Sequence, residues 1–204
     1  MSSVRHGGRP TRREEVVAAA TEAFARGGYN GVSLRDIAAR LNMTPAGVLH
    51  HFGTKEELLT AVLEARDRDE VDRDHYSTFP HGADYLAHMV RTVRLNAERR
   101  GITQLYTVLA GESVADEHPA QDWFRSRYDG LRQIVDRALR RAAEVPDGVL
   151  VAESLEAAEA VIAVMDGMQI QWLLDDEVAM APAVARVIDL VVADLRGRVA
   201  DLTP

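Results

Sequence analysis

Cysteine is absent from the 204 residues, and lysine occurs only once, at position 55. The missing thiols exclude disulfide bonds, cysteine-based catalysis and cysteine-ligated metal sites, and they agree with a reducing compartment. No stretch reaches the roughly 18 apolar residues that a transmembrane helix needs. The arginine-rich first residues are not followed by the apolar segment of a signal peptide. We therefore expect a soluble, cytoplasmic protein that does not enter a membrane.

Alternation of apolar and polar residues, the pattern of a half-buried strand, does not extend over any useful length. Apolar residues recur instead at three-and-four spacing along most of the chain, which is typical of amphipathic helices. Hydrophobic residues make up 47% and charged residues 27% of the chain, so we expect a globular protein. The length suggests one or two domains and permits a sizeable core. The fold class that follows is all-α.

Motifs of the common enzyme classes are missing. The chain has no G-x-S-x-G, no H-E-x-x-H and no glycine pattern for phosphates or dinucleotides. The best metal-like set is His81, Asp84 and His88, because Asp84 and His88 are four residues apart on one expected helix. Solvated or core-edge polar residues explain this set better, since no second cluster accompanies it. We predict no catalytic site, no bound metal and no cofactor.

The charge is unevenly distributed along the chain, although the net charge is −8. Residues 1–55 contain eight Lys or Arg and four acidic residues, a balance of +4. The remainder contains 16 basic and 28 acidic residues, a balance of −12. A basic N-terminal part attached to an acidic remainder predicts that DNA contact is made by the N-terminal part. Chance clustering on a solvated surface is the alternative. Arg5 and Arg9 are suited to reach a minor groove, but a disordered tail is the simpler interpretation.

The segment from Ser33 to Phe52 contains two short helical patterns separated by a turn. Ser33 and Asp36 have the spacing of a capping box, and Thr44 followed by Pro45 marks a second helix start. Two short helices joined by a turn of three or four residues predict a helix-turn-helix. In such a motif the second helix enters the major groove of DNA. The alternative is an ordinary helical hairpin inside an all-α core.

Capping signals also flank this motif. Capping boxes at residues 11–14 and 54–57 open further helices, and Gly27 with Gly28 ends the first of them. Asn42 falls in the turn, where a positive φ is usually needed and where Asn is better tolerated than most residues. The three helices up to Phe52 are too few for a stable core of their own, so we expect the helix from residue 55 to about 74 to support them.

The run GVSLRDIAARLNMTPAGVLHHFGTKEELL resembles the DNA-binding domain of TetR-family transcriptional regulators, and HHFGTKEELL is a specific signature of that family. The resemblance covers about Arg9 to Ala65. Members often carry Gly in place of Asn42, and in place of Leu49 an aromatic residue that touches a DNA phosphate, a bond that Leu49 cannot make. The resemblance implies a TetR-type helix-turn-helix DNA-binding domain over residues 9–69, with the motif at 33–52. It further implies a helical ligand-binding and dimerisation domain over residues 75–204.

We predict that the DNA contacts come from the motif and from the helix start that follows it. Lys55 suits a phosphate, because its ammonium group lies beside the free backbone N–H groups of a helix N-terminus. The polar side chains best placed to reach bases or phosphates are those of Thr44, His50 and His51. The full predicted set comprises Ser33, Arg35, Thr44, Pro45, Ala46, Gly47, Leu49, His50, His51 and Lys55.

A break at residues 79–82 separates the two expected domains. Beyond it we expect helices at about 82–100, 102–115, 119–144, 152–175 and 181–200, with Gly101 as one of the breaks. Aromatic, methionine and polar side chains recur on consecutive helices, as in ligand cavities between the helices of bundles. An ordinary core has the same pattern, and the resemblance implies an inducer site without naming the ligand. The candidate residues are Tyr85, His88, Met89, Tyr106, Trp123, Tyr128, Met165, Met168, Gln169 and Trp172.

The last two expected helices are apolar on more than one side, which indicates burial on two sides. Packing inside one chain explains this pattern, and so does pairing with a second chain as a four-helix bundle. DGMQIQWLLDD resembles the start of the TetR dimerisation segment, so we favour the dimer. The predicted interface residues are Ile162, Met165, Val184, Val187, Ile188, Val191 and Leu195.

These observations predict a homodimeric transcriptional regulator that binds a double-stranded DNA operator and is not an enzyme. The usual member of such a family is a repressor that a small-molecule effector releases from its operator. Two alternatives stay open at this point. One is an activator or nucleoid-type DNA binder that needs no ligand, and the other is a helical enzyme that has retained a helix-turn-helix.

Overall fold

The computed structural model describes residues 10–74 and 83–202, except for the side chains of residues 68–74. Every regular element in these ranges is an α-helix, which confirms the expected fold class. The break expected at residues 79–82 lies outside the described residues. None of the described helices is both long enough and apolar enough to cross a membrane. The helices are α1 (Arg12–Gly27), α2 (Leu34–Arg40), α3 (Pro45–Phe52), α4 (Lys55–Asp74), α5 (Ala83–Ala97), α6 (Arg100–Glu112), α7 (Gln121–Ala142), α8 (Val151–Leu174) and α9 (Met180–Leu202).

Capping residues begin the N-terminal helices where the sequence predicts them. Thr11 and Ser33 form complete capping boxes at the starts of α1 and α2. At the start of α3 the Thr44 side chain accepts a hydrogen bond from the backbone N–H of Gly47. Asn42 in the intervening turn has a φ of 52°, which confirms the predicted positive value. Local sequence alone therefore specifies where the helix-turn-helix begins, turns and resumes.

The first hydrophobic core holds α1, α2 and α3 together with α4. Phe24, Ile37 and Val48 are buried at its centre, and Phe52 closes it beside α4. Leu34 and Leu41 are half-buried against it. The first half of α4 contributes Leu58, Leu59, Val62 and Leu63. This confirms that α4 supports the three small helices.

The same core continues into α6 and the start of α7. Leu105, Tyr106 and Leu109 of α6 belong to it, as does Phe124 of α7. The most extensive contact of α1 is with α6, an association that the sequence did not reveal. The N-terminal helices therefore pack on a helix of the C-terminal part as well as on α4. The division into domains at residues 9–69 and 75–204 stays a prediction, and the packing of side chains does not follow it.

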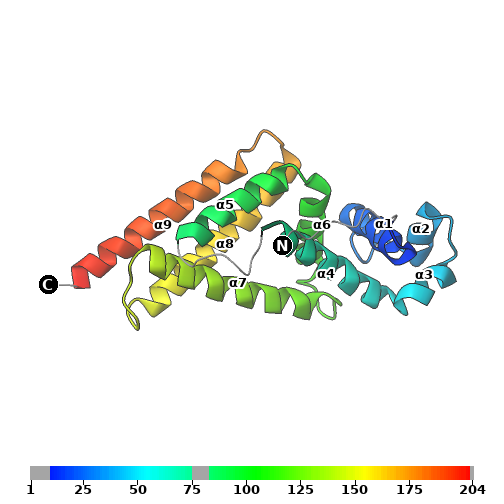
Figure 1. Cartoon of the computed structure of the whole chain (residues 1–204), viewed down its shortest axis with the longest axis horizontal. Helices are drawn as coiled ribbons and strands as arrows, with labels where there is room; N and C mark the ends of the chain where they lie inside the picture. Colours follow the sequence, from blue (N-terminus) through cyan, green and yellow to red (C-terminus); the bar gives the residue numbers. More distant parts are fainter. Residues whose placement is uncertain (1–9, 75–82, 203–204) are drawn as a thin grey trace, which may run out of the picture.

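A second hydrophobic core lies among α5, α7, α8 and α9. Buried residues from all four helices meet there, among them Val93, Leu139, Val161 and Leu195. Helices α5 and α8 both pack on α9, and Figure 1 shows that α9 ends at the opposite end of the molecule from α1–α3. The molecule thus has two hydrophobic cores. We call the boundary between them the seam, and α6 lies on the first-core side of it.

One predicted helix break is wrong. The chain leaves the helical conformation at Glu98 and Arg99, and Gly101 lies inside α6 instead of before it. The hydroxyl of Thr103 donates a hydrogen bond to the backbone carbonyl of Asn96, which stabilises the turn between α5 and α6. Gly101 has open space around it and makes no demand on the backbone, so helix α6 accommodates it at its second position.

Candidate DNA-binding surface and effector cavity

The recognition helix α3 is fixed by contacts on its inner side. Val48 and Phe52 anchor it in the first core, and the guanidinium group of Arg13 lies 4.6 Å from the centre of the Phe52 ring. The preceding turn is tied to α1, because Arg12 Nη2 donates to the backbone carbonyl of Leu41 over 2.8 Å. These contacts leave the opposite side of α3 open to solvent.

All ten predicted DNA-contact residues retain surface. Six are exposed and four are half-buried, so none is lost to the core. Whether they touch DNA stays a prediction. The exposed residues are Ser33, Arg35, Thr44, Pro45, Ala46 and His50, and the half-buried residues are Gly47, Leu49, His51 and Lys55.

Lys55 at the start of α4 is held by Tyr29. Its Nζ donates a hydrogen bond to the Tyr29 carbonyl over 2.6 Å and lies 4.1 Å from the centre of the Tyr29 ring. Partial burial lowers the pKa of the Lys55 ammonium group, with nearby acids acting in the opposite direction. An ammonium group has three N–H donors, so this arrangement leaves donors for a phosphate. Nothing in the sequence indicates that Tyr29 orients Lys55, because the two residues are 26 positions apart.

Comparison with known proteins identifies the N-terminal region that contains α1, α2 and α3. Residues 16–62 match the family described as bacterial regulatory proteins, tetR family. Over 59 residues the chain is 51% identical to the HTH-type transcriptional repressor Rv3405c of Mycobacterium tuberculosis. Residues 16–62 are therefore a region of the tetR family of bacterial regulatory proteins. That match covers 27% of this chain and 31% of the relative, so the similarity is limited to the DNA-binding region.

Solved structures of TetR-type regulators extend the likeness to the whole fold. A TetR transcription regulator from Haloarcula marismortui superposes with a TM-score of 0.71 at 17% identity, covering 89% of this chain and 96% of that one. The transcriptional regulator FadR from Bacillus subtilis, in complex with stearoyl-CoA, gives 0.69 at 17% identity and covers 89% and 98%. The proteins in these matches are regulators of transcription.

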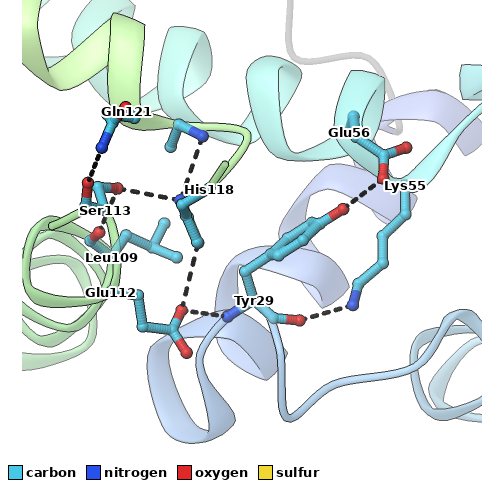
Figure 2. A network of polar contacts seen from close by, with 9 residues as sticks. Tyr29, Lys55, Glu56, Leu109, Glu112, Ser113, His118 and Gln121 are labelled. Carbon is cyan, nitrogen blue, oxygen red and sulfur yellow. Dashed lines mark hydrogen bonds and ion pairs between the residues drawn. The ribbon is translucent and has the colours of Figure 1, made fainter. Parts of the chain in front are cut away.

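The end of α6 makes a polar contact with the segment that follows α1 (Figure 2). The carboxylate of Glu112 accepts a hydrogen bond from the backbone N–H of Tyr29 over 2.6 Å. Gly28 has a φ of 68°, and a Cβ added there would collide with the Glu112 carboxylate. At its other end Tyr29 donates from its hydroxyl to Glu56 Oε1 over 2.7 Å. The contact therefore connects α6, through Tyr29, to the first turn of α4.

His118 packs against the same contact from the loop between α6 and α7 (Figure 2). Its Nδ1 accepts a hydrogen bond from the backbone N–H of Ala120 over 3.2 Å, so the neutral ring carries its proton on Nε2. Nε2 lies 3.8 Å from Glu112 Oε2, and the ring meets the Tyr29 ring edge-on with the centres 5.4 Å apart. Burial lowers the pKa of His118, and the Glu112 charge opposes this shift.

A cavity lies at the seam between the two cores. It is bordered by α4, α5, α6, α7 and α8 and encloses about 560 Å³ of space between atoms, its open mouth included. Six of the predicted ligand residues line it. They are Tyr85, His88, Met89, Tyr106, Met165 and Gln169.

Four other predicted ligand residues do not line this cavity. Tyr128 lies behind the wall, where its hydroxyl donates to Asp166 Oδ2 over 2.6 Å. Trp172 is buried, with the Arg100 guanidinium 5.2 Å from its ring centre, and Trp123 and Met168 pack beside the two cores. Seven further residues line the cavity that were not predicted as ligand residues. The five polar ones look like surface residues in a sequence, and the two apolar ones look like ordinary core residues. The seven residues are Arg66, Thr92, Asn96, Arg127, Leu131, Ile162 and Asp166.

The ionisable groups at the cavity make contacts within the protein. Arg66 Nη1 and Arg127 Nη1 both bind Asp67 Oδ1, over 3.0 and 3.1 Å. The two guanidinium groups lie 4.4 and 5.7 Å from the centre of the Tyr106 ring. Burial raises the pKa of Asp166, although the Tyr128 hydroxyl and both arginines act in the opposite direction. His88 is buried, whereas Asp84 is exposed, and the third member of the metal-like set, His81, lies outside the described residues.

The predicted dimer interface needs correction at four positions. Ile162, Val184, Ile188 and Leu195 are buried inside the single chain and cannot face a partner. Their helices are apolar on two sides because one side fills the second core. Among the other predicted interface residues, Met165 lines the cavity, and Val187 and Val191 are half-buried. The exposed large apolar residues of these two helices are different ones, among them Ile170, Leu174 and Leu190.

Proposed function

We propose that this TetR-family protein is a homodimeric repressor, and that a small molecule bound in the seam cavity lowers its affinity for operator DNA. One observation carries this proposal: the cavity lies between two cores that belong to different functional ends of the molecule. Tyr106 in its wall packs with the DNA-binding helices, whereas Tyr85, Met89 and Ile162 in the same wall pack with α7 to α9. A ligand between them would alter how the two cores fit together.

Helix α6 connects the cavity wall to the DNA-binding helices, so it can transmit a structural change caused by a bound ligand. Tyr106 in the cavity wall and Glu112 at the Tyr29 contact are six residues apart on this helix, about 9 Å at 1.5 Å per residue. A shift of α6 caused by a ligand would therefore displace Tyr29, and with it Lys55. Helix α4 provides a parallel route, because Arg66 lines the cavity and Lys55 begins the same helix.

The dimer is supported by an apolar surface on the outer side of α8 and α9. Ile170, Leu174 and Leu190 are large apolar residues with substantial exposure, and Gly167 lies one turn before Ile170. Exposed apolar patches on a soluble protein mark sites of association. A symmetric pairing of α8 and α9 with their copies would cover this surface and form a four-helix bundle.

In a dimer, a ligand can lower DNA affinity by changing the distance between the two DNA-binding domains. Two recognition helices read successive major grooves only when they lie about 34–36 Å, or a multiple of one helical turn, apart. Coupling free energies between sites are typically about 1–3 kcal/mol, which corresponds to roughly a 5–150-fold change in affinity. Linkage requires that operator DNA weaken ligand binding by the same factor.

The deciding experiment first selects genomic DNA fragments on the purified protein and then measures their affinity across a panel of apolar and amphipathic compounds. We expect at least one compound to weaken binding, and the same compound to bind less tightly when operator is present. Met89→Trp fills the cavity and should abolish the response while unliganded DNA binding persists. Val114→Trp, at an exposed position away from the cavity, is the matched control. A compound that binds the cavity with equal affinity with and without operator would contradict the coupling.

A reporter gene under the selected operator separates repression from activation. Deleting the gene for the protein should raise reporter expression if it is a repressor. Lower expression after deletion would favour the activator alternative and would leave the DNA-binding assignment intact.

A further inference from the structure

Two carboxamide side chains in the cavity wall have no hydrogen-bond partner in the part of the chain that the structure describes. Asn96 of α5 is 6% exposed and Gln169 of α8 is 7% exposed, and both line the seam cavity. Each carboxamide offers one acceptor oxygen and two N–H donors. Polar side-chain groups at a cavity wall that bind no other protein group can bind a ligand or ordered water. The two amides come from two different helices that line one cavity, where one ligand could bind both.

The charged groups around this cavity already bind groups of the protein. One oxygen of Asp67 accepts hydrogen bonds from both Arg66 and Arg127. Asp166 accepts the hydroxyl proton of Tyr128. A ligand with a charged head would lose its own hydration on entry, which costs more free energy than the entry of a neutral head. A neutral head would leave the contacts in place.

The remaining wall is apolar. Met89, Leu131, Ile162 and Met165 contribute thioether and aliphatic side chains. A suitable ligand therefore combines an apolar body with a head that both donates and accepts hydrogen bonds.

We infer that the effector is an uncharged amphipathic compound whose amide-type or hydroxyl-bearing head is bound by Asn96 and Gln169. This inference rests on the proposed function for the location of the effector, and it adds the chemical class. Carboxamides are suited to this role, because their donors and acceptors do not depend on pH. The site then discriminates by hydrogen bonding, which rejects a ligand that leaves buried polar groups unpaired.

Three probes of equal size test the class. Octanamide and octanoate have the same number of non-hydrogen atoms and differ in a terminal NH2 against an O−, and nonylammonium supplies the matched cation. Titration calorimetry on the wild-type protein should give octanamide an affinity at least about tenfold above either ion. Tighter binding of an ion, equal binding of all three or no detectable binding of octanamide would overturn the inference.

Two near-isosteric variants locate the preference. Asn96→Leu and Gln169→Met remove the donors and acceptors while keeping similar volume, so each should lose the preference for octanamide. Neither should lower the melting temperature of the ligand-free protein, because no protein partner is lost, and this readout separates ligand recognition from a packing role. Gln133→Met, on the exposed surface of α7, is the control and should keep the preference. A retained preference in both cavity variants would overturn the assignment.

Operator binding distinguishes this inference from the proposed function. If octanoate or nonylammonium binds better and still weakens operator binding, the repressor proposal stands and the ligand class is wrong. If octanamide is preferred but leaves operator affinity unchanged, the ligand class stands and the ligand response in the proposed function fails.

Discussion

Glu112 accepts the backbone N–H of Tyr29 over 2.6 Å, although the two residues are 83 positions apart in the sequence. This hydrogen bond joins the end of α6 to the segment that leads from α1 into the helix-turn-helix. On the far side of Tyr29, its carbonyl holds the Lys55 ammonium group. The predicted phosphate ligand is thus oriented by a residue that the C-terminal part of the chain contacts directly.

Removing the Glu112 carboxylate should destabilise the protein. Glu112→Ala leaves the Tyr29 N–H without its acceptor, and the expected loss in the free energy of unfolding is about 1–3 kcal/mol. Glu112→Gln keeps an acceptor oxygen and should recover most of this loss. Urea denaturation followed by circular dichroism measures both variants. Equal losses in the two variants would show that charge, and not the hydrogen bond to Tyr29, is what matters.

Gly28 should tolerate no side chain. Gly28→Ala places a Cβ against the Glu112 carboxylate and imposes a positive φ on alanine, so we expect a loss of at least about 1 kcal/mol. Gly130 is the matched control, because it lies within α7 with open space around it. Gly130→Ala should stabilise the protein by roughly 0.5–1 kcal/mol. Thermal unfolding measures the stability of both variants. An unchanged melting temperature for Gly28→Ala would mean that α6 can move away from Gly28 without a loss of stability.

Acidification should weaken the fold through His118. Burial lowers the pKa of this residue below its unfolded value of 6.5, so the unfolded chain binds more protons between the two values. The contribution of His118 is therefore fully present above pH 6.5 and is lost as the pH falls from there toward the folded pKa. Urea midpoints between pH 8 and pH 5 should fall more steeply in the wild type than in His118→Asn, whose Oδ1 can still accept the Ala120 N–H. Parallel profiles would exclude His118 as a source of the pH dependence.

Lys55→Ala should weaken binding to all DNA sequences about equally and lower the salt slope of the affinity by about one unit, since one phosphate contact is lost. Arg35→Ala, at an exposed position of α2, should do the same. Arg198→Ala near the end of α9 is the control, because it lies far from α1–α3 and should leave the slope unchanged (Figure 1). An unchanged slope for Lys55→Ala would assign Lys55 to the Tyr29 contact alone.

The oligomeric state should depend on the outer side of α9. Leu190 is 59% exposed in the single chain, and Leu190→Asp would bury two unpaired carboxylates in the proposed dimer. We expect monomers in analytical ultracentrifugation and a large loss of operator affinity with the fold intact. Val114→Asp, at a position that is 81% exposed beyond the end of α6, is the control and should stay dimeric. A wild-type monomer at micromolar concentration would contradict the dimer itself.

The sequence alone determined the local architecture of the DNA-binding region. Ser33, Thr44 and Asn42 act on backbone groups within a few residues of themselves, so their roles can be recognised without knowing the fold. The tertiary structure decided everything that depends on which helices meet. Ile188 and Leu195 are equally apolar whether they face a partner chain or the core of their own, and only packing placed them inside. Glu112 and Asn96 look like surface residues in the sequence, yet one contacts the N-terminal helices and the other lines the cavity. Hydrophobic periodicity reports that a side of a helix is buried, but it does not report against what, because the hydrophobic effect has no direction.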